Sequence, residues 1–463
     1  MSDSGFIRFL RDESGAYTIW SLIWFSLYVA MGGLAVDVTD AYRNQTILQS
    51  TADASALAGV MSLPDQDDAV VQALIYSSDN MDPALNGNVL DEAEVFLGNW
   101  DFDDRIFTAG TAAPDAVRVI TRRDDANENP LATNFLRILS LWGIPLDRWN
   151  ISVEAVAVRY VPDCLTDGFV SYNWVDMNGG NDFYNDICIH GQNEVEDNGQ
   201  DYGIDIGNGN TFEGPSLDGP GVTVSTPYPD QDITNNNPTC NQNDGLCGPN
   251  GAKVAGDLWP TDVDRVGDFV NGLRNLDPDF LPDFMVDVAE GSEIRTTAAG
   301  VLVETLGSLP ETFVENTVYI INCNGQIKLP GVLISGVVIV ANCRIHSASG
   351  LRLEDAVLAT SYAGNNAAIS IAAQSTIGRA DFCDNGGGVE MYTPGNVHIA
   401  AGGDWHGLRI VSGSNVKFTS NNVGVYGISV QARNMIDMSS NNEFGLCTGG
   451  VPGQFAWHYR LVR

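Results

Sequence analysis

An uncharged apolar stretch near the start of the chain constrains its fold most. From Ser14 to Val36 no residue carries a charge, and aromatic and aliphatic side chains dominate. In a helix that rises about 1.5 Å per residue the stretch covers roughly 34 Å, enough for the roughly 30 Å hydrocarbon core of a bilayer. The apolar part of a cleaved signal peptide is only about 7–15 residues long. We therefore predict that residues 14–36 form a retained transmembrane helix, preceded by a short cytoplasmic segment, residues 1–13.

The basic residues and the cysteines indicate the same orientation of that helix. Arg8 and Arg11 precede the stretch, whereas Arg43 is the nearest basic residue after it, which favours a cytoplasmic N-terminus. All the cysteines lie beyond the stretch, and their even number is typical of disulfides in an oxidising compartment. They are Cys164, Cys188, Cys240, Cys247, Cys323, Cys343, Cys383 and Cys447. We therefore expect everything after Asp37 to lie outside the cytoplasm.

The cysteines also allow two alternatives, reduced thiols in the core or zinc ligands. Buried free thiols are common in proteins. Zinc requires close pairs such as Cys-x-x-Cys, and the chain contains none. If the cysteines form disulfides, the shortest loops join Cys164 to Cys188, Cys240 to Cys247, and Cys323 to Cys343. We predict disulfides and no metal site.

Residues 37–63 continue the helical pattern, because Ala, Leu and Gln are frequent and glycine and proline are absent until Gly59. Ala52, Ser55 and Ala58 form a stripe of small residues on one face of this helix. Such a stripe permits close packing against another element. That element is either the chain's own domain or a helix of a partner protein.

Four motifs follow one another in this part of the chain. They are Phe-Leu-Arg-Asp-Glu-x-Gly-Ala at residues 9–16, Gly-Leu-Ala-Val-Asp at 33–37, Arg-x-Gln-x-x-Leu-Gln at 43–49 and Ala-Asp-Ala-x-Ala-Leu-Ala-Gly at 52–59. In this combination residues 9–60 resemble the TadE/TadG-like N-terminal module of TadG-like proteins of the Flp (tight-adherence) pilus assembly system. The resemblance implies a single-pass protein of the bacterial inner membrane, with most of the chain in the periplasm. It also implies that the partners are other pilus-assembly proteins or pseudopilins.

The chain departs from that family in two respects. Many larger members carry a von Willebrand-type domain with an Asp-x-Ser-x-Ser metal site, and the segments after Asp53 and Asp437 break this pattern. The related pseudopilins are cut after a glycine that is followed five residues later by glutamate. Gly5 and Gly15 lack that glutamate. We therefore expect neither the metal-binding domain nor processing as a pilin.

Beyond the helix the sequence pattern changes twice. The segments Ala116–Arg123 and Ile151–Arg159 alternate apolar and polar residues as half-buried strands do. With the helical spacing that precedes them, they predict a small α+β module at residues 64–161 near the membrane. From Pro162 onward asparagine and glycine are dense and short β-branched runs alternate with turn residues.

A repeat marks this C-terminal region. Asn396, Asn415 and Asn434 each start a short apolar run, and they stand nineteen residues apart. A period near 20 residues with several short strands is typical of a parallel β-helix. Ile436 and Met438 lie one residue out of phase with the copy before, which predicts a slipped register or a bulge there.

The domain organisation follows from these patterns. We predict an all-β, right-handed parallel β-helix at residues 162–455, with a long loop at about 229–260, and a C-terminal tail at 456–463. An all-β sandwich is the alternative fold, because its short strands look similar in sequence.

Charge and motif content narrow the function. The chain has 23 Lys and Arg against 59 Asp and Glu, a net charge of −36, which argues against nucleic acid as a partner. Possible catalytic carboxylates are Asp381 with Asp384, Asp201 with Asp205, and Asp404 beside His406. None lies in a recognisable catalytic pattern, so we predict no catalytic, cofactor-binding or metal-binding residues and no enzyme activity.

Two function classes remain. We expect a non-enzymatic, membrane-anchored component of Flp/Tad-type pilus assembly that projects a β-helical domain into the periplasm. The alternative is an envelope β-helix protein that binds or processes glycans.

Overall fold

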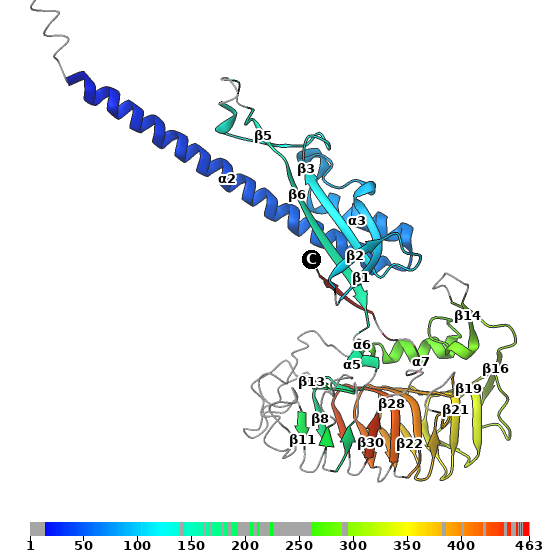
Figure 1. The fold of residues 1–463 in the computed structure, drawn as a ribbon. Coiled ribbons are helices and arrows are strands. Elements are labelled where there is room, and N and C mark those ends of the chain that lie inside the picture. Colours follow the sequence, from blue (N-terminus) through cyan, green and yellow to red (C-terminus); the bar gives the residue numbers. More distant parts are fainter. Residues whose placement is uncertain are drawn as a thin grey trace, which may run out of the picture. The chain divides into compact units, whose positions relative to one another are not determined.

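Figure 1 shows the fold of the chain in a computed structural model. The chain divides into two compact units: unit 1 comprises Met1–Tyr160 with His458–Arg463, and unit 2 comprises Val161–Trp457. The structure describes residues 14–102, 104–138, 143, 145–161, 163–166, 168–177, 180–183, 187–191, 204–206, 211–212, 223–225, 261–288, 295–381, 386–400, 402–419, 423–438, 442–445, 451, 453, 455 and 457–462. The predicted loop at 229–260 lies outside the described residues.

One long helix, α2 (Ser14–Ser62), dominates unit 1 (Figure 1). The apolar stretch and the segment predicted to continue it are therefore a single helix. From Ile19 onward α2 is long and apolar enough to cross a membrane. The helix ends just before Pro64, because proline disfavours the helical conformation for the residue that precedes it.

The rest of unit 1 is an α+β arrangement around the second half of α2. Its other elements are α3 (Gln66–Asn80), α4 (Pro83–Asn86), η1 (Glu92–Glu94), β1 (Val95–Asp101), β2 (Ile106–Ala109), β3 (Ala116–Arg123), β4 (Leu131–Ala132), β5 (Arg148–Trp149), β6 (Ile151–Tyr160) and β31 (His458–Leu461). The main sheet is antiparallel, in the order β2-β1-β3-β6-β31. The core combines residues of α2, α3 and this sheet, among them Ala52, Ala73, Val117 and Ala155.

The last strand of unit 1 comes from the far end of the sequence. β31 pairs antiparallel with β6, and Tyr160 lies opposite His458. Within the segment predicted as a C-terminal tail, residues 458–461 thus form an edge strand of the sheet. This strand pairs with the backbone groups of β6, which would otherwise be an open edge. The chain leaves unit 1 after Tyr160 and returns at His458, so unit 2 is inserted between two paired strands.

Unit 2 is mostly β-structure with parallel sheets, which confirms the predicted class of the C-terminal region in outline. Its first elements are α5 (Asp163–Thr166), β7 (Gly168–Ser171), β8 (Trp174–Met177), β9 (Asp182–Phe183), β10 (Cys188–Gly191), β11 (Ile204–Ile206), β12 (Thr211–Phe212), β13 (Thr223–Ser225), α6 (Thr261–Asp264), α7 (Val266–Asn275), η3 (Asp283–Met285), β14 (Val286–Val288), β15 (Arg295–Thr297) and β16 (Leu302–Leu306). β17 (Thr317–Ile321), β18 (Gln326–Leu329), β19 (Leu333–Ala341), β20 (Arg344–Ser347), β21 (Arg352–Thr360), β22 (Ile369–Ile371), β23 (Thr376–Ile377), β24 (Val389–Thr393), β25 (Val397–Ala400), β26 (Trp405–Ser412), β27 (Val416–Thr419), β28 (Val423–Ala432), β29 (Met435–Met438) and β30 (Asn442–Gly445) follow.

Most strands of unit 2 form two large sheets, whereas β14 and β15 pair only with each other. One runs β12-β9-β30-β28-β26-β23-β21-β19-β17-β16, and the other runs β11-β8-β29-β27-β25-β22-β20-β18. From β16 to β30 the chain contributes strands to the two sheets largely in alternation, and neighbouring strands in each sheet are parallel. Each pass of the chain therefore adds a layer to both sheets.

The nineteen-residue repeat corresponds to the spacing of these layers. Val397 pairs with Val416, nineteen residues later, and Val416 pairs with Ile436 after a step of twenty. The phase difference noted in the sequence is taken up before Ile436, because Ile436 and Met438 are still fully buried in register with Val416 and Phe418. The buried side chains between the two sheets form one continuous column, which we call the inner column. The predicted slip does not displace the side chains of this column.

The layers of unit 2 are not stacked in sequence order. β7, the first strand, pairs with β28 near the end of the unit, so that Gly168 lies opposite Ser429. β8 pairs with β29 and β9 with β30 in the same way. The first layer of the sequence is therefore stacked on the last one. Phe169 and Phe444 pack edge to face at this junction, 5.1 Å apart.

Helices α6 and α7 cover the outer face of the larger sheet (Figure 1). In β19 the side chains of Val337 and Ile339 belong to the inner column, whereas Val338 and Val340 pack with α7 residues such as Phe269. A strand that is buried on both faces reads as a continuous apolar run rather than an alternating one. This explains the sequence Val-Val-Ile-Val-Ala at residues 337–341.

Candidate membrane anchor and packing surface

The first half of α2 presents a continuous apolar surface. Ten large apolar side chains between Ile19 and Met31 are between 43% and 66% exposed. They are Ile19, Trp20, Leu22, Ile23, Trp24, Phe25, Leu27, Tyr28, Val29 and Met31. Water-soluble proteins rarely leave so large an apolar patch open. This half of the helix has the length, composition and exposure of a membrane anchor.

The second half of α2 is the core helix of unit 1. Ala52 and Ser55 are fully buried and Ala58 is 8% exposed. A Cβ atom placed on Gly59 would lie 3.1 Å from the carbonyl oxygen of Ala69 in α3 and 3.1 Å from Val117 Cγ1 in β3. The predicted small-residue stripe is therefore covered by the chain's own domain, the first of the two alternatives.

Polar contacts also hold the helix on the sheet. Thr121 Oγ1 in β3 donates to the backbone oxygen of Leu48 at 3.2 Å. From the helix, Gln49 Nε2 donates to the backbone oxygen of Glu154 in β6, also at 3.2 Å. Because these bonds join residues far apart in sequence, they fix the rotation of α2 about its axis relative to the sheet.

Asp37 marks the boundary between the two halves of α2. Its carboxylate is almost fully buried and accepts three consecutive backbone N–H groups. Oδ1 accepts from Asn134 at 2.7 Å, and Oδ2 accepts from Phe135 at 3.0 Å and from Leu136 at 2.7 Å. A carboxylate that accepts several N–H bonds is a strong local clamp. The sequence singles out Asp37 as the first charged residue after the uncharged stretch. It does not reveal the backbone groups that Asp37 binds, because they lie about a hundred residues away.

Gly33, one helical turn before Asp37, completes this contact. A Cβ atom on Gly33 would lie 2.8 Å from Phe135 Cβ, so any larger residue would displace the phenyl ring. Gly33 and Asp37 stand four residues apart and thus lie on the same face of the helix. Together they dock the segment 133–138 onto the last turn of the apolar stretch.

The disulfide predictions concern eight cysteines, of which the structure describes a few. Cys323 and Cys343 form a disulfide with a Cα–Cα distance of 5.8 Å, which confirms this pair. Cys188 is also disulfide-bonded. Cys240, Cys247, Cys383 and Cys447 lie outside the described residues, as does the side chain of Cys164.

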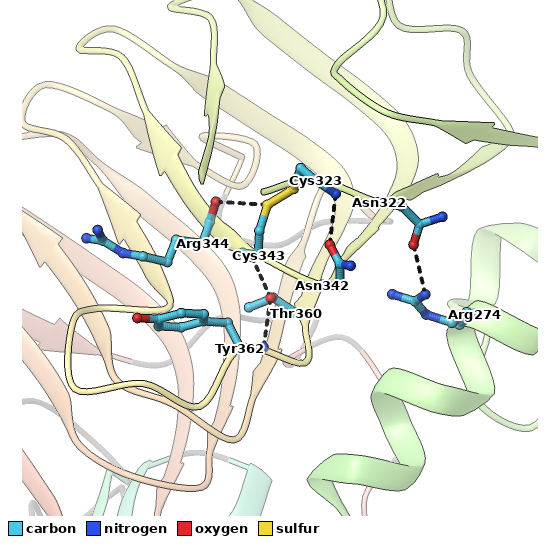
Figure 2. The surroundings of a disulfide bond; sticks show 8 residues. All are labelled: Arg274, Asn322, Cys323, Asn342, Cys343, Arg344, Thr360 and Tyr362. Carbon is cyan, nitrogen blue, oxygen red and sulfur yellow. Dashed lines mark hydrogen bonds between the residues drawn. A yellow bond between two sulfur atoms is a disulfide. The ribbon is translucent and has the colours of Figure 1, made fainter. Parts of the chain in front are cut away.

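The Cys323–Cys343 bridge joins two neighbouring layers of unit 2 (Figure 2). Asn342 Oδ1 accepts the backbone N–H of Cys323 at 2.9 Å, and Thr360 Oγ1 donates to the carbonyl of Cys343 at 2.6 Å. Thr360 belongs to the next layer. The bridge therefore reinforces a stack of turns that the backbone already hydrogen-bonds together.

The sequence did not reveal a buried charged cluster on the outer face of the larger sheet. Arg409 donates to Asp262 Oδ2 at 2.8 Å and to Tyr392 Oη at 3.1 Å, and the guanidinium lies 4.1 Å from the ring centre of Phe455. Tyr392 also donates to Glu390, whose pKa is raised by burial. Arg409 and Asp262 are both fully buried. Because the cluster is closed to solvent, it joins α6 to the sheet rather than offering a reactive surface.

Of the carboxylates considered as catalytic candidates, the structure describes Asp381 and Asp404, and both lie near His406, since their charges act to raise the pKa of this imidazole. Asp381 lies 3.8 Å from Arg379 in an ion pair, and His406 stacks on Tyr426 with 5.5 Å between ring centres. Burial lowers the pKa of His406. Asp201, Asp384 and the side chain of Asp205 lie outside the described residues. Among the described residues, no group of three or more His, Cys, Asp and Glu side chains could hold a metal ion.

Two family models match the chain. One is described as "Putative Flp pilus-assembly TadE/G-like" and matches residues 15–62, almost the whole of α2. The other is described as "Domain of unknown function (DUF7867)" and matches residues 168–448, more than half of the chain. No curated protein and no solved structure matches the chain. The first match confirms the resemblance of the N-terminal module to the Tad family.

Proposed function

The chain belongs to the family that carries the domain of unknown function DUF7867, and we propose that this member is a single-pass, membrane-anchored component of Flp/Tad-type pilus assembly. The observation that carries the proposal is the TadE/G-like match over α2. The matched helix has an exposed apolar half and a buried half. The module thus consists of an anchor that is continuous with the core of a folded domain.

We infer that unit 2 is a right-handed parallel β-helix that the anchor holds at the membrane. The parallel pairing of layers nineteen or twenty residues apart supports this fold. Parallel β-helices are elongated and stiff, because each turn packs on its neighbours. Unit 2 then serves as a spacer or capture surface rather than as a catalyst.

The proposed orientation places the N-terminus in the cytoplasm and both units in the periplasm of the bacterial inner membrane. The Cys323–Cys343 disulfide supports a location outside the reducing cytoplasm. A reporter enzyme fused after Arg463 tests the orientation. It should be active only when it is of the kind that works outside the cytoplasm, and activity of a cytoplasmic reporter at that position would contradict it.

Partner recovery tests the assembly role. The small-residue stripe is buried in unit 1, whereas the first half of the helix exposes a continuous apolar surface, so we expect partner helices to contact that half. We therefore replace residues 14–32 with an unrelated transmembrane helix and keep Gly33 and Asp37, which dock the segment 133–138. The tagged full chain is then recovered from solubilised envelopes, and co-purified proteins are identified by mass spectrometry.

The expected result is that the native chain recovers pilus-assembly proteins and the exchanged variant recovers fewer, with unchanged thermal unfolding of both units. A second variant, Ala52→Leu, serves as the control: it should lower the melting temperature of unit 1 without changing the anchor. Equal partner recovery by the native and exchanged chains would contradict the proposal that the anchor binds pilus-assembly proteins. Binding of envelope glycans by both chains would then favour the glycan-binding alternative.

A further inference from the structure

We propose that the segment 133–138 of unit 1 is a second membrane contact, which rests in the interfacial layer of the bilayer that the anchor crosses. The inference depends on the proposed membrane anchor and adds a surface to it. In this proposal the contacts of Gly33 and Asp37 hold the segment beside the end of the apolar stretch, where it can reach the bilayer.

The clamp sets the position of the segment along α2. Three backbone N–H groups of residues 134–136 bind the Asp37 carboxylate at 2.7–3.0 Å, and the ring of Phe135 occupies the space left free by Gly33. Since both helix residues lie in the last turn of the apolar stretch or directly after it, the segment is at the level where the helix leaves the membrane.

The height of that level follows from helix geometry. The uncharged stretch covers roughly 34 Å at about 1.5 Å per residue, slightly more than the roughly 30 Å hydrocarbon core. If the stretch spans the core, Gly33 and Asp37 fall at its edge. Phe135, which touches Gly33, then lies at the edge of the hydrocarbon core, where its apolar ring can be removed from water.

The surface of the segment suits lipid. Phe135 is 45% exposed and Ile138 is 48% exposed, although they lie on a segment held by partly buried hydrogen bonds. On the adjoining turn of α2, Leu34 and Val36 are likewise exposed, at 46% and 48%. These apolar surfaces adjoin the exposed face of the anchor. The bilayer that surrounds the anchor would therefore cover them as well.

Depth-dependent fluorescence quenching tests the inference. The full chain carrying Ile138→Cys, labelled with an environment-sensitive fluorophore, is reconstituted into vesicles of phosphatidylcholine and phosphatidylglycerol. Some of the lipids carry a nitroxide quencher on the acyl chain. Leu27→Cys in the anchor is the positive control, and Leu85→Cys in α4, 82% exposed, is the control on the surface of unit 1 outside the segment 133–138.

Quenching at residue 138 should approach that at residue 27 and exceed that at residue 85. In the Asp37→Asn variant the quenching at 138 should decrease while that at 27 does not. If the label at 27 is quenched and the label at 138 is quenched no more than that at 85, the membrane contact is overturned and the segment is open to a protein partner. If the label at 27 is also unquenched, the anchor itself is overturned, and the inference falls with it.

Discussion

The interiors of the two units are built from side chains of different size. In unit 1, α2 meets α3 and the sheet through Ala52, Ala73 and Ala155, all fully buried. In unit 2, the inner column is formed by large side chains such as Phe418 and Trp405, also buried. A helix can approach a sheet closely only where its side chains are small, whereas stacked layers enclose a space that must be filled.

This difference predicts opposite sensitivities. A helix interface that is closed around alanine residues has little room for additional atoms, and overpacking forces side chains and backbone to move. An interior filled with large side chains instead loses contacts and gains a cavity when one of them is truncated. Unit 1 should therefore be more sensitive to enlargement, and unit 2 more sensitive to truncation.

The largest effect is expected for Phe418→Ala in unit 2. Phe418 lies between Phe169 and Trp405, with ring centres 6.2 Å and 5.7 Å away, so its removal leaves a cavity that crosses the junction of the first and last layers. The free energy of unfolding of unit 2, measured by denaturant titration of the full chain, should fall by about 3–5 kcal/mol. The exposed Lys328→Ala is the control. A change for Phe418→Ala within about 0.5 kcal/mol, typical of surface sites, would contradict the buried column.

The next effect is expected for the double variant Cys323→Ser with Cys343→Ser. The bridge closes a loop with a sequence separation of 20, and a disulfide of that size stabilises by about 3 kcal/mol in the chain-entropy description. Since both cysteines lie in unit 2, we expect only unit 2 to become less stable in the denaturant titration of the full chain. Equal destabilisation of unit 1 would show that the two units do not unfold separately.

A smaller effect is expected for Ala52→Leu in unit 1. The added atoms should destabilise the unit by about 1–3 kcal/mol, because α3 and the sheet leave no space around this residue. Ala30→Leu is a matched control on the same helix, since Ala30 is exposed and should tolerate leucine. The melting temperature of unit 1 is measured for both variants. Equal melting temperatures would contradict the division of α2 into an open and a packed half.

The smallest effect is expected for Asn396→Ala, which leaves both interiors intact. Asn396 Oδ1 accepts the backbone N–H of Asn415 at 3.2 Å, and its Nδ2 donates to the carbonyl of Asn365 at 3.2 Å. Loss of these bonds at a turn should lower the stability of unit 2 by about 0.5–1.5 kcal/mol. A loss as large as that of Phe418→Ala would mean that the turns, and not the column, hold the layers together.

Sequence patterns predicted the parts of this molecule that depend on neighbours in the chain. The uncharged stretch predicted the start of α2, and the nineteen-residue step predicted the pairing of Val397 with Val416. Both patterns are local or repeat at a fixed interval. The Cys323–Cys343 pair was accessible for the same reason, because the separation of the two cysteines is close to one repeat.

The contacts that close the two units were not predictable in this way. Gly168 pairs with Ser429, and Asp37 binds the backbone of residues 134–136. Arg409 binds Asp262 across a similar gap. Such partners are selected by the three-dimensional arrangement, since an arginine has 59 chemically similar acidic residues to pair with, a carboxylate can accept from almost any backbone N–H, and a short strand can pair with many others.

The pairing of β31 with β6 has a consequence for biosynthesis. The sheet of unit 1 holds a strand from residues 458–461, so it stays incomplete until residues 161–457, which form unit 2, and this strand have been translated. During that interval β6 has an open edge, and open edges invite pairing with other chains. A chain that stops early would keep this edge. The pairing of β31 with β6 thus makes synthesis of unit 2 a condition for closing the sheet of unit 1.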